Sequence, residues 1–167
     1  MDLRPYIGWI IFFHVAGAFM FVAGHGVSMF VAFQVKRERD RAKLAALLDL
    51  SGWSLGVAGI GMLILFVAGI LAGIVLNSWD KSWIWISLGL FIAISLLMTP
   101  IGSAYFTGAR KAIGQRTRGL KAGDPDPVPV GDQELEAILD SPRPRLLLTI
   151  GGVGFLLILW LMMFRPF

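Results

Sequence analysis

The stretch IGWIIFFHVAGAFMFVAGHGVSMFVAF, residues 7–33, contains no aspartate, glutamate, lysine or arginine. A helix needs about 20 apolar residues to cross the hydrocarbon core of a bilayer, because backbone N–H and C=O groups in lipid must bond to one another. The stretch meets that length, and it is too long for the apolar region of a cleaved signal peptide. We therefore interpret it as a retained membrane-spanning helix.

Three more apolar runs without charged residues follow, at residues 55–76, 83–104 and 146–164. Hydrophobic residues make up 56% of the 167-residue chain and charged residues only 16%, which is too apolar for a surface that faces water on all sides. The sequence predicts an all-α protein, a bundle of four transmembrane helices that forms one integral membrane domain over residues 1–167. Its first partner is then the lipid bilayer.

Basic residues gather in two of the three connections. Five lysines and arginines lie between residues 36 and 43, and seven lie in the linker at 108–145, out of 15 in the chain. Because lysine and arginine accumulate in cytoplasmic loops, we expect both connections in the cytoplasm and both termini outside, in a plasma (inner) membrane of bacterial type. The same placement beside the spans explains the net charge of +4 without nucleic acid as a partner.

The cytoplasmic segments are expected to carry short amphipathic helices. Residues 36–51 are compatible with a helix that extends the first span or lies on the membrane surface. Three prolines exclude regular helix from residues 123–131. After them, Asp132 is suited to cap a short helix with Leu135, Ile138 and Leu139 on one face.

Several residues predict how the spans are arranged. The few residues at 77–82 require an antiparallel hairpin of the second and third spans, and Pro100 allows a kink in the third. Trp53 and Tyr105 fall near the cytoplasmic boundary, where aromatic rings are enriched. Glycine pairs at small-xxx-small spacing, which suit a compact bundle or a homo-oligomer, are Gly52 with Gly56 and Gly69 with Gly73.

The two histidines of the chain, His14 and His25, both lie inside the first span. They are eleven residues apart, so on a helix they return to within roughly 20° of one another and are separated by about 16 Å along the axis. Both are expected to face one neighbour, since an imidazole in lipid needs a partner. Gly17 and Gly24 flank this stripe and leave room for another helix or a flat ligand.

This spacing restricts which cofactor the histidines can hold. The axial nitrogens of one haem are about 4 Å apart, so His14 and His25 cannot both ligate a single haem within the chain. A haem or chlorophyll with one axial imidazole, or with a second ligand from a methionine or another subunit, fits the pattern. Copper(I) is an alternative, because His25 and Met29 form an i, i+4 pair of soft ligands. The plainest alternative is that each imidazole bonds a carbonyl or hydroxyl across the bundle and serves packing alone.

Other chemistry finds little support in the sequence. The absence of cysteine excludes thiolate ligands and a thiol nucleophile. No paired carboxylates, HExxH motif or phosphate-binding loop occurs, and the spans hold no acidic residue for a proton relay. We therefore do not expect an enzyme that acts alone.

The first span, from His14-Val15-Ala16-Gly17 through Gly24-His25-Gly26 to the basic segment Lys36-Arg37-Glu38-Arg39-Asp40, resembles a family of uncharacterised predicted bacterial integral membrane proteins. That family is distantly similar to the copper resistance D proteins. The resemblance implies a helical membrane protein in which His14 and His25 bind haem or metal. This chain is shorter than a copper resistance D protein and has no further histidines. Together, these observations favour a small accessory subunit or binding protein that works with other membrane subunits; the rival is a purely structural subunit without ligand.

Overall fold

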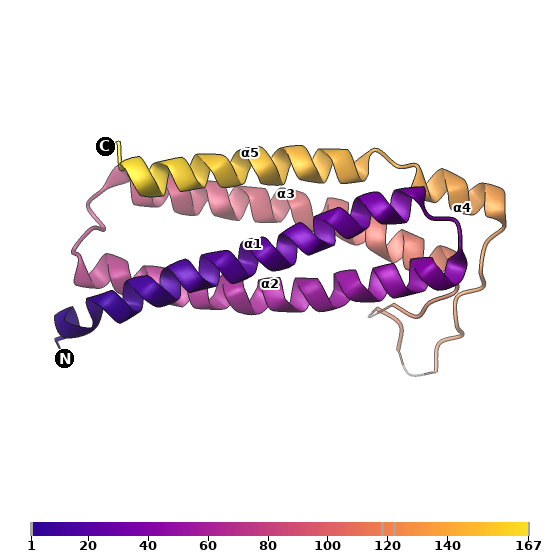
Figure 1. Cartoon of the computed structure of the whole chain (residues 1–167), viewed down its shortest axis with the longest axis horizontal. Coiled ribbons are helices and arrows are strands. Elements are labelled where there is room, and N and C mark those ends of the chain that lie inside the picture. Colours follow the sequence, from indigo (N-terminus) through magenta and orange to yellow (C-terminus); the bar gives the residue numbers. More distant parts are fainter. Residues whose placement is uncertain (1, 118, 122, 167) are drawn as a thin grey trace.

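The computed structural model describes residues 2–117, 119–121 and 123–166, and all regular structure in them is helical (Figure 1). A short 3-10 helix, η1, covers Arg4–Tyr6 and leads into the first long helix. The α-helices are α1 (Ile7–Arg37), α2 (Arg41–Val75), α3 (Ser82–Ala112), α4 (Asp132–Leu139) and α5 (Arg143–Phe164). Helices α1, α2, α3 and the segment Asp132–Phe164, which contains α4 and α5, are long and apolar enough to cross a membrane. The all-α prediction is confirmed, and the four segments are consistent with a multi-pass membrane protein.

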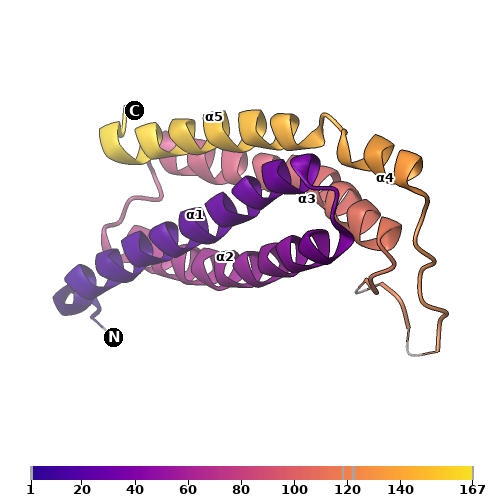
Figure 2. The ribbon, with the colours of Figure 1, turned by 45° about the vertical axis from the view of Figure 1, so that its right-hand side comes forward.

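The four long helices are arranged as two pairs (Figures 1 and 2). Helix α1 packs against α2 along most of its length, and α3 packs against α5. The short connection at residues 76–81 brings the ends of α2 and α3 together, as the predicted hairpin requires. Beyond it the two helices diverge, because each packs on a different partner.

Both termini lie at one end of the molecule, together with the connection between α2 and α3 (Figure 1). The other end, which we call the basic end, carries α4, the turn Glu38–Asp40 between α1 and α2, and the described residues between α3 and α4 (113–117, 119–121 and 123–131). An even number of long helices that run back and forth brings the two termini to the same end of the molecule.

Small residues form the interface of α1 with α2. The buried positions of α1 recur with heptad spacing, at Ile10, Gly17, Gly24 and Val31 and at Ser28 and Val35. A methyl group added to Gly17 would lie 2.5 Å from the backbone nitrogen of Leu65, and one added to Gly24 would lie 2.5 Å from the carbonyl oxygen of Ser54. The two backbones are therefore in direct contact, as van der Waals packing between membrane helices requires.

The glycines that make this contact are not the pairs that the sequence spacing indicated. Gly61 of α2 packs on the backbone of Phe21 and on Gly17, whereas Gly56 has no neighbour within 4 Å of an added methyl group. Gly69 and Gly73 instead accept the rings of His14 and Trp79. Spacing indicates close packing, but it does not tell which helix face is covered.

Helix α3 changes partner along its length. In its first two thirds Ile94 and Met98 pack into α5 at Gly154 and Gly151. It continues without a break through Pro100, and its last turns approach α1, α2 and α4 (Figure 1). A proline removes one helical hydrogen bond and crowds the preceding turn, which permits a change of direction in this part of the helix.

The core with the largest side chains sits at the basic end, where both helix pairs and α4 meet. Tyr105 is its centre, and its hydroxyl can donate to the carbonyl oxygens of Ala32 and Leu139 at 3.2 and 3.4 Å. The sequence placed Tyr105 at a membrane boundary, but the ring is buried. The fully buried members of this core are Val31, Ala32, Val35, Leu44, Leu48, Tyr105, Ala109, Ala112, Leu135 and Leu139.

Residues 36–51 were expected to extend the first span or to lie on the membrane surface. Most of them, from Arg41 onward, instead form the first turns of α2. Helix α1 ends at Arg37, the chain turns at Glu38–Asp40, and α2 begins at Arg41. The carboxylate of Asp40 accepts from the backbone N–H groups of Ala42 and Lys43 at 2.8 and 3.0 Å, a regular N-cap. The cap explains why the helix restarts there.

Helix α4 differs from expectation in its cap. Gly131 is the N-cap, and Asp132 is the first helical residue, where it pairs with Arg41 at 2.8 Å. Arg41 also donates to the carbonyl oxygens of Val130 and Ala112 and so links the residue before Gly131 and the end of α3 to the start of α2. Leu135 and Leu139 are buried against the core.

Candidate intramembrane histidine site

His14 lies in the second turn of α1 and points toward α2. Its ring nitrogen Nδ1 is 3.0 Å from the carbonyl oxygen of Leu65. A methyl group on Gly69, one turn further along α2, would lie 3.0 Å from both Cε1 and Nδ1 of the ring. The imidazole therefore occupies the space that the missing side chain of Gly69 provides.

This contact fixes the tautomer of His14. A carbonyl oxygen only accepts, so Nδ1 carries the proton and donates it. In the neutral ring the lone pair is then on Nε2, the nitrogen that most often ligates metals. An Nδ1–H bond to a backbone carbonyl is the usual way in which proteins orient a ligating histidine.

His25 lies three turns further along α1 and has a different environment. Its ring stacks on Phe21 with a centroid distance of 5.5 Å and an interplanar angle of 24°. Phe21 in turn contacts the edge of Phe91 in α3 at 6.1 Å. Because the ring stacks on Phe21, which contacts Phe91, it lies on the side of α1 that faces α3. Among the described residues, no hydrogen bond to either of its ring nitrogens is present.

The two histidines thus differ in what holds them. His14 is hydrogen-bonded into the α1/α2 interface, whereas His25 is held by ring stacking; both are partly exposed. Met29 follows one turn after His25 and is also partly exposed. Gly17 and Gly24 were expected to leave room for another helix or a flat ligand, and the structure fills that room with another helix, α2. A flat ligand would therefore approach from the side of α3 or from lipid.

The described part of the chain holds no ligand set of several residues. In residues 2–117, 119–121 and 123–166, no three or more histidine, cysteine, aspartate or glutamate side chains gather closely enough to hold a metal ion. A metal at this site would need one imidazole together with methionine or with donors from outside the chain. A tetrapyrrole needs only one imidazole, because its own four nitrogens complete the equatorial set.

Little in the sequence identifies the residues that contact His14 and His25. The acceptor of His14 is a backbone carbonyl, which any residue at position 65 would supply. Gly69 was noticed only as a packing residue. Phe21, on the stripe with the histidines, was the one neighbour that helical spacing could identify.

No family model, curated protein or solved structure matches the chain.

Proposed function

We propose that this protein is a small integral membrane subunit that holds a tetrapyrrole, of haem or chlorophyll type, through one axial imidazole. His14 is the first candidate ligand. The observation that supports it is the bond from Nδ1 to the Leu65 carbonyl, which orients the ring and leaves Nε2 with its lone pair. His25, with partly exposed ring nitrogens and an aromatic neighbour, is the second candidate ligand.

The proposed topology follows from charge. The basic end carries most lysines and arginines, so it lies in the cytoplasm, and both termini lie outside a plasma membrane of bacterial type. His14 is then in the outer half of the bilayer and His25 is closer to its middle. Large apolar side chains such as Phe19, Leu63 and Leu96 are exposed on the long helices and serve as contacts with lipid or with neighbouring subunits.

A structural subunit without ligand is the second candidate function, and one observation favours it. The bond of His14 to Leu65 already provides the partner that an intramembrane imidazole needs, and it links α1 to α2. A copper(I) site at His25 and Met29 is a third, and it needs at least one donor beyond this pair.

The deciding measurement is the visible absorption of the full chain, purified in detergent from membranes and also after loading with haemin. We expect a Soret band or chlorin absorption that His14→Ala removes. The matched variant Ser28→Ala, on the same helix face, should keep it. Absence of any such band in both preparations would overturn the tetrapyrrole proposal.

The same variants separate the rival functions. If His14 serves packing alone, His14→Ala lowers the thermal stability of the protein and no spectrum changes. For copper, the protein is loaded with copper(I) under reducing conditions and the bound metal is counted. Copper that is lost in His25→Ala and in Met29→Leu, but kept in His14→Ala, would support the copper site instead.

A further inference from the structure

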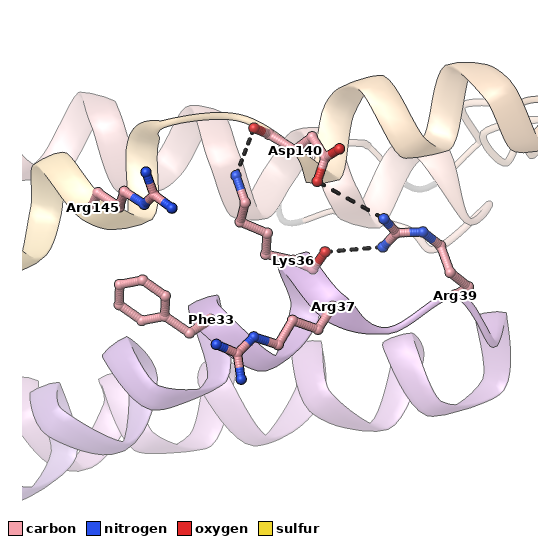
Figure 3. A pocket seen from close by; sticks show the side chains of 6 residues that line it. All are labelled: Phe33, Lys36, Arg37, Arg39, Asp140 and Arg145. Carbon is pink, nitrogen blue, oxygen red and sulfur yellow. Dashed lines mark hydrogen bonds and ion pairs between the residues drawn. The ribbon is translucent and has the colours of Figure 1, made fainter.

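A hollow of about 380 Å³ lies at the basic end, between the last turn of α1 and the junction of α4 with α5 (Figure 3). This volume is in the range of binding sites for small molecules. Because the wall comes from both helix pairs, the hollow exists only in the folded assembly. The side chains that line it are Phe33, Lys36, Arg37, Arg39, Asp140 and Arg145.

The lining carries four cationic groups and one carboxylate. Arg39 is compensated, since its guanidinium lies 3.3 Å from Glu136 and 3.8 Å from Asp140. Lys36 is held in place by two carbonyl oxygens after α4, those of Asp140 at 2.7 Å and Ser141 at 3.2 Å. Carbonyls orient the ammonium group but do not cancel its charge.

Arg37 and Arg145 complete the positive charge of the hollow. Across residues 2–117, 119–121 and 123–166, neither guanidinium forms an ion pair or a hydrogen bond. In the view of Figure 3 the ring of Phe33 lies between these two groups. Two uncompensated guanidinium groups and an oriented ammonium group around one hollow are suited to an anion with several acceptor oxygens.

The position of the hollow, next to the apolar parts of α1 and α5, indicates the source of that anion. Phe33 forms its apolar side, and the neighbouring Phe30 and Leu146, which continue into the apolar parts of α1 and α5, are 64% and 48% exposed. A headgroup in the hollow would thus have apolar helix surface beside it for its acyl chains. Basic pockets between membrane helices at this level are typical sites for anionic lipid headgroups.

We infer that this hollow binds the phosphate group of an anionic phospholipid, with Arg37, Arg145 and Lys36 as its cationic contacts. The lipid would then join α1 to the α4/α5 junction and so bridge the two helix pairs. This site is separate from the histidines, and its test is independent of them.

The test uses the full chain in neutral detergent, with dioleoylphosphatidylglycerol or dioleoylphosphatidylcholine added and the bound lipid counted by native mass spectrometry. The pocket variant is Arg37→Gln with Arg145→Gln. The matched control is Lys43→Gln with Arg143→Gln, which removes the same charge from exposed residues outside the hollow. Thermal unfolding of each variant confirms that it is folded.

We expect the wild type to prefer phosphatidylglycerol. The pocket variant should bind it about 25-fold more weakly, at roughly fivefold for each of the two cations removed, and the control should retain it. Addition of inorganic phosphate at millimolar concentration then distinguishes a lipid headgroup from free phosphate as the ligand. Lipid that stays bound supports the headgroup, whereas lipid displaced by inorganic phosphate would make free phosphate the ligand. Equal binding of the two lipids by the wild type, or equal losses in both variants, would overturn the proposal.

Discussion

The basic end and the opposite half of the molecule hold their helices together by different means. At the basic end, large side chains from α1, α2, α3 and α4 are buried around Tyr105. In the opposite half, glycines bring the backbones of α1 and α2 into direct contact, and α3 and α5 form a separate pair. This difference is the one expected between helices next to water and helices in lipid. Burial of apolar side chains lowers the free energy next to water, whereas in lipid it contributes little and helices associate through close van der Waals packing.

The largest effect should come from a cavity in the core of the basic end. Leu48 is fully buried, whereas Leu50 on the same helix is 49% exposed. Leu48→Ala should lower the free energy of unfolding by about 2–5 kcal/mol, because it removes apolar contacts and leaves a void. Leu50→Ala should change it by less than about 0.5 kcal/mol. Thermal unfolding of the full chain in detergent measures both, and equal losses would contradict this description of the core.

The second comparison probes the contact of backbones in the opposite half. Gly24→Leu forces a side chain into the backbone of Ser54 and Ala58, whereas an added side chain at Gly26 meets nothing within 4 Å. We expect a loss of about 1–3 kcal/mol for Gly24→Leu and no loss for Gly26→Leu. Crosslinking between cysteines placed on α1 and α2 would show whether the helices separate. A Gly24→Leu protein as stable as the wild type would rule out direct backbone contact.

A smaller change tests the hydrogen bonds of Tyr105 without creating a cavity. Tyr105→Phe removes the hydroxyl that bonds the carbonyl oxygens of Ala32 and Leu139. The expected loss is about 1 kcal/mol, the usual net contribution of one such bond. Tyr6→Phe, at an exposed tyrosine, is the control and should have no effect. Chemical unfolding measures the difference, and identical curves for the two variants would show that the hydroxyl bonds add nothing.

The smallest expected effect concerns pH and the turn between α1 and α2. Bonds from the backbone N–H groups of Lys43 and Ala42 hold the pKa of Asp40 below its usual value, and the N–H groups of Asp40 and Arg39 do the same for the pKa of Glu38. Both groups therefore stabilise the fold at neutral pH, and this contribution is lost as the pH falls through their lowered pKa values.

Asp40→Asn keeps the cap but does not titrate. Its melting temperature should therefore fall less steeply than that of the wild type between pH 5 and the lowered pKa values in the folded state. Calorimetry over this pH range measures the slopes. Parallel slopes for the two proteins would show that Asp40 has no part in the acid sensitivity.

Much of the fold could be predicted from the sequence, because the solvation of the backbone in lipid leaves few choices. The four spans were found within a few residues at the end that carries the termini. At the basic end the helices run further than the apolar runs, since charged residues such as Arg110 and Lys111 can continue a helix. The pairing of α1 with α2 and of α3 with α5 was not predicted, because glycines occur in all these helices.

The candidate site was predicted only as a pair of residues. Helical spacing placed His14 and His25 on one stripe, but it could not tell that one imidazole bonds a carbonyl and the other stacks on Phe21. Which helix covers the stripe depends on tertiary packing. The hollow could not be predicted from the sequence for the same reason. Its lining comes from two segments, residues 33–39 and 140–145, which are more than 100 positions apart in the chain.

The change of partner along α3 has a mechanical consequence. Helix α3 packs against α5 at Ile94 and Met98, and its last turns belong to the core around Tyr105. It therefore ties the two helix pairs together at the basic end. A membrane neighbour that inserts between the pairs from the end with the termini would have to separate Phe21 from Phe91, while the core around Tyr105 would keep the pairs joined.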